Sequence, residues 1–207
     1  MFDRLKTSLE RLLPLSREEF VQFATLLTPR RLAKHEPFLR AGEVCTHIAF
    51  INQGCLRYYY LKDGNEFNGQ FFFEGAWVGD YQSFLTGQPS VQYIDALEDA
   101  ELLVMPRADL QTLYGEQPRF ERFGRLLAEN VVIGSQRRTA SLLFDTPEDR
   151  YLKLIAERPK VVERIPLHHI ASYLGIKPKA SRASANGSPI TDSRAFLNSS
   201  QLLYRRS

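Results

Sequence analysis

The stretch Arg164-Ile-Pro-Leu-His-His-Ile-Ala-Ser-Tyr-Leu-Gly-Ile176 carries the most specific pattern in this chain. Ile170, Ala171 and Leu174 lie on one face of a short helix, because they are spaced as neighbours on a helical surface. Ala171 is small enough to let a second helix approach, and Gly175 can take the positive φ of a tight turn between helices. The stretch therefore predicts the first helix and the turn of a helix-turn-helix motif.

Upstream of this motif the pattern is first helical and then rich in strands. Residues 2–27 have apolar side chains at helical spacing, and Ser16 and Glu19 have the spacing of a capping box. From Arg30 to Pro106, short β-rich runs are separated by turns that contain glycine, one of which is 62–65, a hairpin turn. This section predicts an antiparallel β-roll.

After Pro106 the helical pattern returns as one long amphipathic helix. Its apolar face has spacings of three and four residues, and charged side chains flank it. We interpret the face as the interface of a homodimer, and the alternative is that it covers the β-roll. The residues of this face are Phe120, Phe123, Leu127, Val131 and Gly134.

The composition excludes several classes of protein. The chain has 207 residues, and 27 basic against 24 acidic side chains give a net charge of +3, which is too small to indicate a nucleic-acid partner by charge alone. There is no apolar signal run and no stretch of about 18 apolar residues. Cys45 and Cys55 cannot form a disulfide framework, so we expect a cytoplasmic chain with reduced thiols.

A helical start, a β-roll, a long helix and the motif at 164–176, in that order, resemble the cyclic-AMP receptor / fumarate-nitrate regulator family of bacterial transcription factors over about residues 1–178. The resemblance implies an α+β fold: an N-terminal antiparallel β-roll (a double-stranded β-helix or jelly roll) with flanking helices, a long dimerisation helix, and a C-terminal winged-helix-like helix-turn-helix. It implies a sensor domain at 1–115, the dimerisation helix at 116–143 and a DNA-binding domain at 144–207. Such a protein couples the sensing of a small effector to DNA binding.

Family members that bind cyclic AMP carry a Gly-Glu pair for the ribose and, about ten residues later, an arginine for the phosphate. Here Gly79-Asp80 stands for the pair, whereas Ser90 stands near the arginine position, and no Arg or Lys occurs between Lys62 and Arg107. Burying a phosphate without a cation is costly. We therefore expect an unknown small effector that is not a cyclic nucleotide.

An aromatic pocket with a few polar groups is the candidate effector site. The alternative is that these side chains are ordinary β-roll core. The candidate ligand-binding residues are Trp77, Gly79, Asp80, Tyr81, Ser83 and Phe84.

Nothing in the sequence predicts catalysis. The four histidines lack the spacing of a zinc site, and there is no phosphate-binding loop, nucleophile elbow or dinucleotide fingerprint. We expect no enzyme, no cofactor and no metal. A cupin-like enzyme is a third reading, and it would need a metal.

The resemblance also implies DNA contacts around the helix-turn-helix. For the two histidines, solvated helix positions are the alternative. The candidate DNA-binding residues are His168, His169, Ser172, Tyr173, Lys177, Lys179 and Arg182.

The tail that follows departs from the family pattern. Between Ile176 and Ile190 there is no apolar anchor, and residues 186–189, Asn-Gly-Ser-Pro, break helices, so the helix-turn-helix is incomplete. A frame shift of one base near codon 179 explains this, because the displaced frame can read Glu-Ser-Leu-Ser-Arg-Ile-Arg-Lys-Arg-Ile-Ala, an amphipathic helix rich in arginine. The natural protein would then bind DNA and this chain would not. The alternative is a stand-alone β-roll dimer that binds a small ligand and has a vestigial C-terminal domain.

Overall fold

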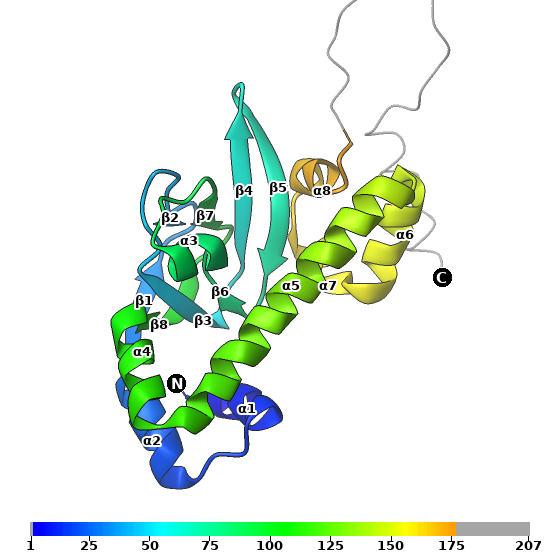
Figure 1. Ribbon diagram of the computed structural model, residues 1–207. Coiled ribbons are helices and arrows are strands. Elements are labelled where there is room, and N and C mark those ends of the chain that lie inside the picture. Colours follow the sequence, from blue (N-terminus) through cyan, green and yellow to red (C-terminus); the bar gives the residue numbers. More distant parts are fainter. Residues whose placement is uncertain (1, 177–207) are drawn as a thin grey trace, which may run out of the picture. The chain divides into compact units, whose positions relative to one another are not determined.

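The computed structural model describes residues 2–176 of the chain, which divides into two compact units, Met1–Thr139 and Ala140–Ser207. Before α5 begins, the first unit holds four α-helices and eight strands, and the third of these helices lies between two strands (Figure 1). Its elements are α1 (Asp3–Leu12), α2 (Arg17–Thr25), β1 (Thr28–Leu32), β2 (Pro37–Leu39), β3 (His47–Gln53), β4 (Leu56–Lys62), β5 (Asn65–Phe72), β6 (Trp77–Val78), α3 (Tyr81–Thr86), β7 (Tyr93–Ala96), β8 (Ala100–Pro106), α4 (Arg107–Glu116) and the 3-10 turn η1 (Pro118–Phe120). The α5 helix (Glu121–Phe144) continues into the second unit, which also contains α6 (Pro147–Glu157), α7 (Pro159–Arg164) and α8 (Leu167–Tyr173).

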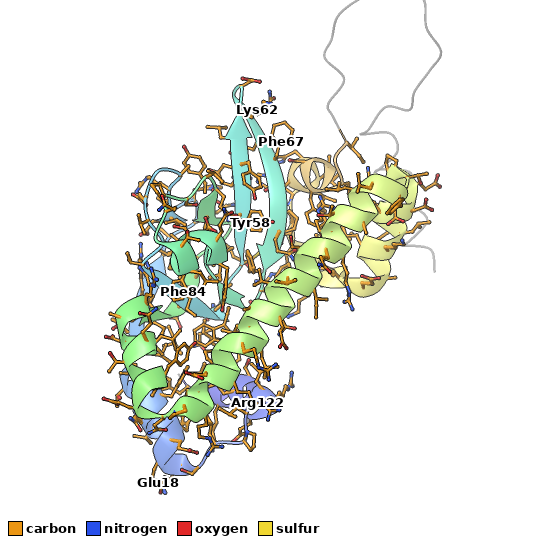
Figure 2. The ribbon with its side chains drawn as sticks, in the orientation of Figure 1. Glu18, Tyr58, Lys62, Phe67, Phe84 and Arg122 are labelled. Atoms are coloured by element: carbon orange, nitrogen blue, oxygen red, sulfur yellow. The ribbon has the colours of Figure 1, made fainter. Side chains whose placement is uncertain are left out.

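The strands form two antiparallel sheets of four strands, in the orders β1-β8-β3-β6 and β2-β7-β4-β5. The longest hairpin joins β4 to β5 through Asp63 and Gly64, which both have positive φ, as a tight hairpin turn requires. Figure 2 shows Lys62 and Phe67 near the tip of this hairpin and Tyr58 further down the same pair of strands. The α+β class with an antiparallel β-roll is confirmed.

The core of the first unit lies between the two sheets. It extends to α1 and α2, which precede the strands in the chain, and to α4 and α5, which follow them. Phe23 of α2 is buried there with its ring centroid 5.6 Å from that of Phe120 and 5.3 Å from that of Phe123. Leu127 is buried as well. This part of the apolar face of α5 therefore covers the β-roll of its own chain, and the predicted dimer interface is corrected to that extent. Val131 and Gly134, in the following turns, are exposed.

The second unit builds a small core of its own from three helices. Thr146 caps α6 in a capping box with Asp149, and Pro147 occupies the first helical position, where no amide hydrogen bond is lost. Within the described residues, the buried apolar side chains of this unit are Tyr151, Leu154, Val161, Ile165, Ile170 and Leu174.

The turn after α8 has the geometry that the sequence predicts. Gly175 has φ +69°, and its N–H donates to the carbonyl of Ser172. Arg150 fixes the same turn from α6, because its Nε donates to the carbonyl of Leu174 at 2.8 Å. The helix and turn are thus held in place up to Ile176, and the predicted second helix of the motif, together with the rest of the atypical tail, lies outside the described residues.

Candidate functional site

Asp80 is the polar residue around which the candidate effector site is built. It is the N-cap of α3, and its Oδ1 accepts hydrogen bonds from the backbone N–H groups of Gln82 at 3.0 Å and Ser83 at 3.3 Å. A carboxylate is well suited to this position, because it satisfies amides at the start of a helix that have no partner within the helix. One oxygen of Asp80 is therefore engaged in holding the backbone.

The other oxygen of Asp80 is bound to Ser90. The Ser90 hydroxyl donates to Asp80 Oδ2 at 2.7 Å, and the two residues are only 2% and 3% exposed. These are the positions at which the family resemblance places a ribose-binding carboxylate and a phosphate-binding arginine. In this chain the residues at these two positions are hydrogen-bonded to each other.

Ser83 is also part of the framework of this loop. Its hydroxyl accepts from the N–H of Cys45 at 2.9 Å and donates to the carbonyl of Gln88 at 2.5 Å, which ties α3 to the segment before β3. Burial raises the pKa of the Cys45 thiol. The thiol is therefore protonated and unreactive at neutral pH.

The aromatic members of the candidate site belong to the core. Trp77 packs between three phenylalanine rings, with centroid distances of 5.3 Å to Phe123, 5.5 Å to Phe50 and 6.3 Å to Phe23. Phe84 is buried on α3, where Figure 2 labels it, and its centroid is 6.1 Å from that of Tyr81.

Space in this region is also filled. Burial raises the pKa of the Tyr81 hydroxyl. Gly79 lies against Ile48, since a Cβ at position 79 would come within 2.9 Å of Ile48 Cγ2. The structure thus brings all six predicted residues together near α3, and it uses them for packing and capping. Two clefts on the described surface, of about 710 and 680 Å³, are lined by other residues.

The charged cluster around Arg57 is a feature that the sequence did not indicate. Arg57 on β4 is buried, and its Nε and Nη2 donate to the two carboxylate oxygens of Asp95 on β7 at 2.8 and 3.1 Å. Its Nη1 binds Glu66 at 2.6 Å and Asn68 at 3.1 Å, and its guanidinium lies 4.1 Å from the ring centroid of Tyr59. Asp95 follows Arg57 by 38 residues, so only the pairing of β4 with β7 reveals the contact.

The candidate DNA-binding residues fall partly inside the described region. His168 on α8 is exposed, whereas His169 is buried, and their ring centroids are 3.9 Å apart. Ser172 and Tyr173 are half-buried on the same helix. The three remaining candidates lie outside the described residues: Lys177, Lys179 and Arg182.

The described part of the chain has neither a cluster of metal ligands nor a membrane-spanning helix. In residues 2–176, no three His, Cys, Asp or Glu side chains come together as a metal-binding group. In the same residues, no helix is both long enough and apolar enough to cross a membrane.

Comparison with known proteins gives one family and several similar folds. Residues 29–117 match the family of the cyclic nucleotide-binding domain. No curated protein matches the chain.

Several solved structures have similar folds, and some of them are described as regulators. FixK2 from Bradyrhizobium japonicum has a TM-score of 0.70 at 15% identity, and the match covers 87% of this chain and 85% of that one. CLP from Xanthomonas campestris, described as a c-di-GMP responsive global regulator, has a TM-score of 0.63 at 17% identity, with 76% and 84% covered. A putative regulator of the CRP/FNR family from Eubacterium rectale has a TM-score of 0.62 at 17% identity, with 80% and 82% covered. Residues 29–117 are thus similar to the cyclic nucleotide-binding domain, and the fold of the chain is similar to the folds of these proteins, as the resemblance predicts.

Proposed function

We propose that this chain is a regulatory protein of the CRP/FNR type. Residues 29–117 match the cyclic nucleotide-binding domain, and the fold is similar to that of CRP/FNR-type regulators. The observation that carries the proposal is the half helix-turn-helix at the end of the described residues. There α8 ends at Tyr173, and Gly175, two residues later, has positive φ, as the turn between two packed helices requires. DNA is the proposed partner of the natural protein, and the cytoplasm its proposed location. The proposed domains remain 1–115, 116–143 and 144–207.

The effector of the proposed regulator is a small molecule other than a cyclic nucleotide. The hydrogen bond between Asp80 and Ser90 supports this, because a ribose or a phosphate would have to displace it without gaining a cation. Titration calorimetry of the full chain with cyclic AMP and cyclic GMP tests the point, and we expect no binding heat. Saturable binding of either nucleotide at micromolar concentration would contradict it.

We propose that a second copy of the chain covers the exposed part of α5. Three consecutive apolar residues, Val131, Val132 and Ile133, are 44, 53 and 46% exposed in the single chain, and Gly134 beside them leaves open space for a neighbouring helix. We expect Val131→Glu to shift the mass measured by sedimentation from dimer to monomer. Asn130→Glu adds the same charge at the adjacent exposed position and is the matched control. A wild-type chain that sediments as a monomer would refute the dimer.

The DNA-binding experiment has to separate the natural protein from this chain, because we propose that a frame shift near codon 179 removed the recognition helix. The encoding DNA is sequenced across codons 170–207 from an independent genomic template. Two chains, the present one and one with the displaced frame restored, are then used to select binding sites from fragmented genomic DNA.

We expect the restored chain to enrich specific sites and the present chain to enrich none, because each lost bidentate arginine contact to a base costs about 1–3 kcal/mol. Site-specific binding by the present chain would refute the frame-shift proposal. Failure of both chains would instead favour the stand-alone ligand-binding dimer with a vestigial C-terminal domain.

A further inference from the structure

A concave site in the first unit is lined by residues other than those of the candidate effector site. It is a cleft of about 680 Å³, formed where β1, the start of β3, the end of β8 and the first turns of α4 meet. Two strand pairings hold its walls in register, Thr28 with Val104 and His47 with Pro106. A volume in this range is typical of pockets for small organic ligands.

The side chains that line this cleft carry positive charge only. Arg30 of β1 and Arg107 of α4 are the two permanently charged residues of the lining, and none of the lining residues is Asp or Glu. Val104, Pro106 and Ala108 supply an apolar surface beside these charges. A ligand that matches the cleft therefore carries a negative charge and an apolar body.

Arg30 is held in position without a strong ionic partner. Its guanidinium lies 5.6 Å from the ring centroid of Phe38, which orients it. The carboxylate of Glu36 is 3.9 Å from Arg30 Nη2, too far for a hydrogen bond, and the other oxygen of Glu36 accepts from the N–H of Ala33. Arg30 thus keeps guanidinium N–H groups for a ligand.

Arg107 is also anchored by an uncharged group. Its Nη2 donates to the carbonyl of Leu85 at 3.1 Å, which fixes the side chain and leaves its charge uncompensated. His47, which also lines the cleft, has its Nδ1 3.1 Å from Thr46 Oγ1. Burial and the charge of Arg30 lower the pKa of His47, so the imidazole is neutral at pH 7 and adds no charge to the cleft.

We propose that this cleft binds a small organic carboxylate with an apolar body. The two arginines pair with the carboxylate charge, and the apolar body lies against Val104 and Pro106. Guanidinium groups suit this role because their planar N–H donors match the geometry of a carboxylate. The site is independent of DNA binding, so its test stands apart from that of the regulator.

Titration calorimetry of the full chain with octanoate tests the proposal, and 1-octanol and inorganic phosphate are the comparison ligands. We expect saturable binding of one octanoate, with 1-octanol and phosphate each binding roughly tenfold more weakly or worse. Arg30→Gln and Arg107→Gln each weaken octanoate roughly tenfold. Arg31→Gln, the next residue on β1, is the control, since its side chain is 86% exposed, pairs with Glu101 and does not line the cleft.

Two further measurements locate the ligand. Ala108→Trp fills the cleft and keeps both arginines, so it abolishes octanoate binding while the circular dichroism of the chain stays unchanged. In the wild-type chain, octanoate raises the pKa of His47 followed by NMR, because a bound anion offsets the charge of Arg30. Octanoate binding that leaves the pKa of His47 unchanged would overturn the proposal.

Three other results would overturn it. The first is equal binding of octanoate and 1-octanol, and the second is equal binding of octanoate and phosphate. The third is binding of poly-glutamate in the absence of octanoate binding, which would make the cleft a docking surface for an acidic protein segment.

Discussion

Replacing Asp80 by alanine tests whether this residue is a structural cap or a ligand-binding group. The substitution removes the N-cap of α3, which costs about 1 kcal/mol for an acidic cap. It also leaves the buried Ser90 hydroxyl without its acceptor, which costs about 1–3 kcal/mol. The carbonyl of Gln92 is 3.0 Å from the same hydroxyl and can take over part of that role. We therefore take the lower end of the range and expect a total loss of about 2 kcal/mol in the free energy of unfolding.

Urea unfolding followed by fluorescence measures this loss, because Trp77 is the single tryptophan and lies in the core. A double-mutant cycle isolates the hydrogen bond: Asp80→Ala, Ser90→Ala and the double variant are compared with the wild type. Residues in one hydrogen-bonded network show coupling of about 0.5 kcal/mol or more. Here we expect about 1 kcal/mol, since the bond is buried and charged.

The reasoning would be refuted by an Asp80→Ala chain that unfolds at the wild-type urea concentration, or by effects of the two substitutions that simply add. The first result would mean that Asp80 is dispensable to the fold, and the second that its hydrogen bond with Ser90 adds nothing to stability. A dispensable buried carboxylate is what a ligand-binding role predicts, because functional groups are commonly retained at a cost in stability.

Three other substitutions test separate parts of the fold by the same urea measurement. Gly54→Ala is expected to lower the free energy of unfolding by about 3 kcal/mol or more, because φ is +99° and the new Cβ would lie 2.7 Å from backbone atoms. Gly64→Ala is expected to cost about 1 kcal/mol, because φ is +74° but the space around the new Cβ is open. Equal losses would contradict the steric reasoning. Wild-type stability falls as the pH drops below about 6.5, because the lowered pKa of His47 means that the unfolded chain binds a proton that the folded chain does not; His47→Gln should reduce this slope below pH 6.5, and an unchanged slope would count against it. Asp95→Asn is expected to cost about 3 kcal/mol, since it leaves the buried charge of Arg57 without its bidentate partner, and a loss below about 0.5 kcal/mol would show that Glu66 and Asn68 suffice.

Local features of the fold could be predicted from the sequence because their signatures are local. The capping box at Ser16 and Glu19 and the turn at Gly175 both depend on residues within a few positions of one another. Each has the predicted geometry in the structure. The β-roll was also predictable, because its turns recur at short intervals.

The features that escaped prediction depend on contacts between distant parts of the chain. The periodic face of α5 shows that something covers it, and it does not say whether the cover is the β-roll or a second chain. Phe123 and Val131 belong to the same face and have different environments. Likewise, the pairing of Asp80 with Ser90 and of Arg57 with Asp95 follows from side chains that the fold brings together. A resemblance that assigns Asp80 to a ligand cannot show that its oxygens are already engaged.

Because both cysteines are buried, the rate at which each thiol is labelled reports how often the structure around it opens. Cys45 and Cys55 are each 1% exposed, so a thiol reagent reaches either sulfur only when the structure around it opens. Cys45 lies beside Ser83 and the α3 loop, and Cys55 precedes β4 in the opposite sheet. The two labelling rates therefore time two different openings in one molecule. A small molecule that tightens the α3 loop slows the labelling of Cys45 alone, which allows effectors to be screened without any knowledge of the operator.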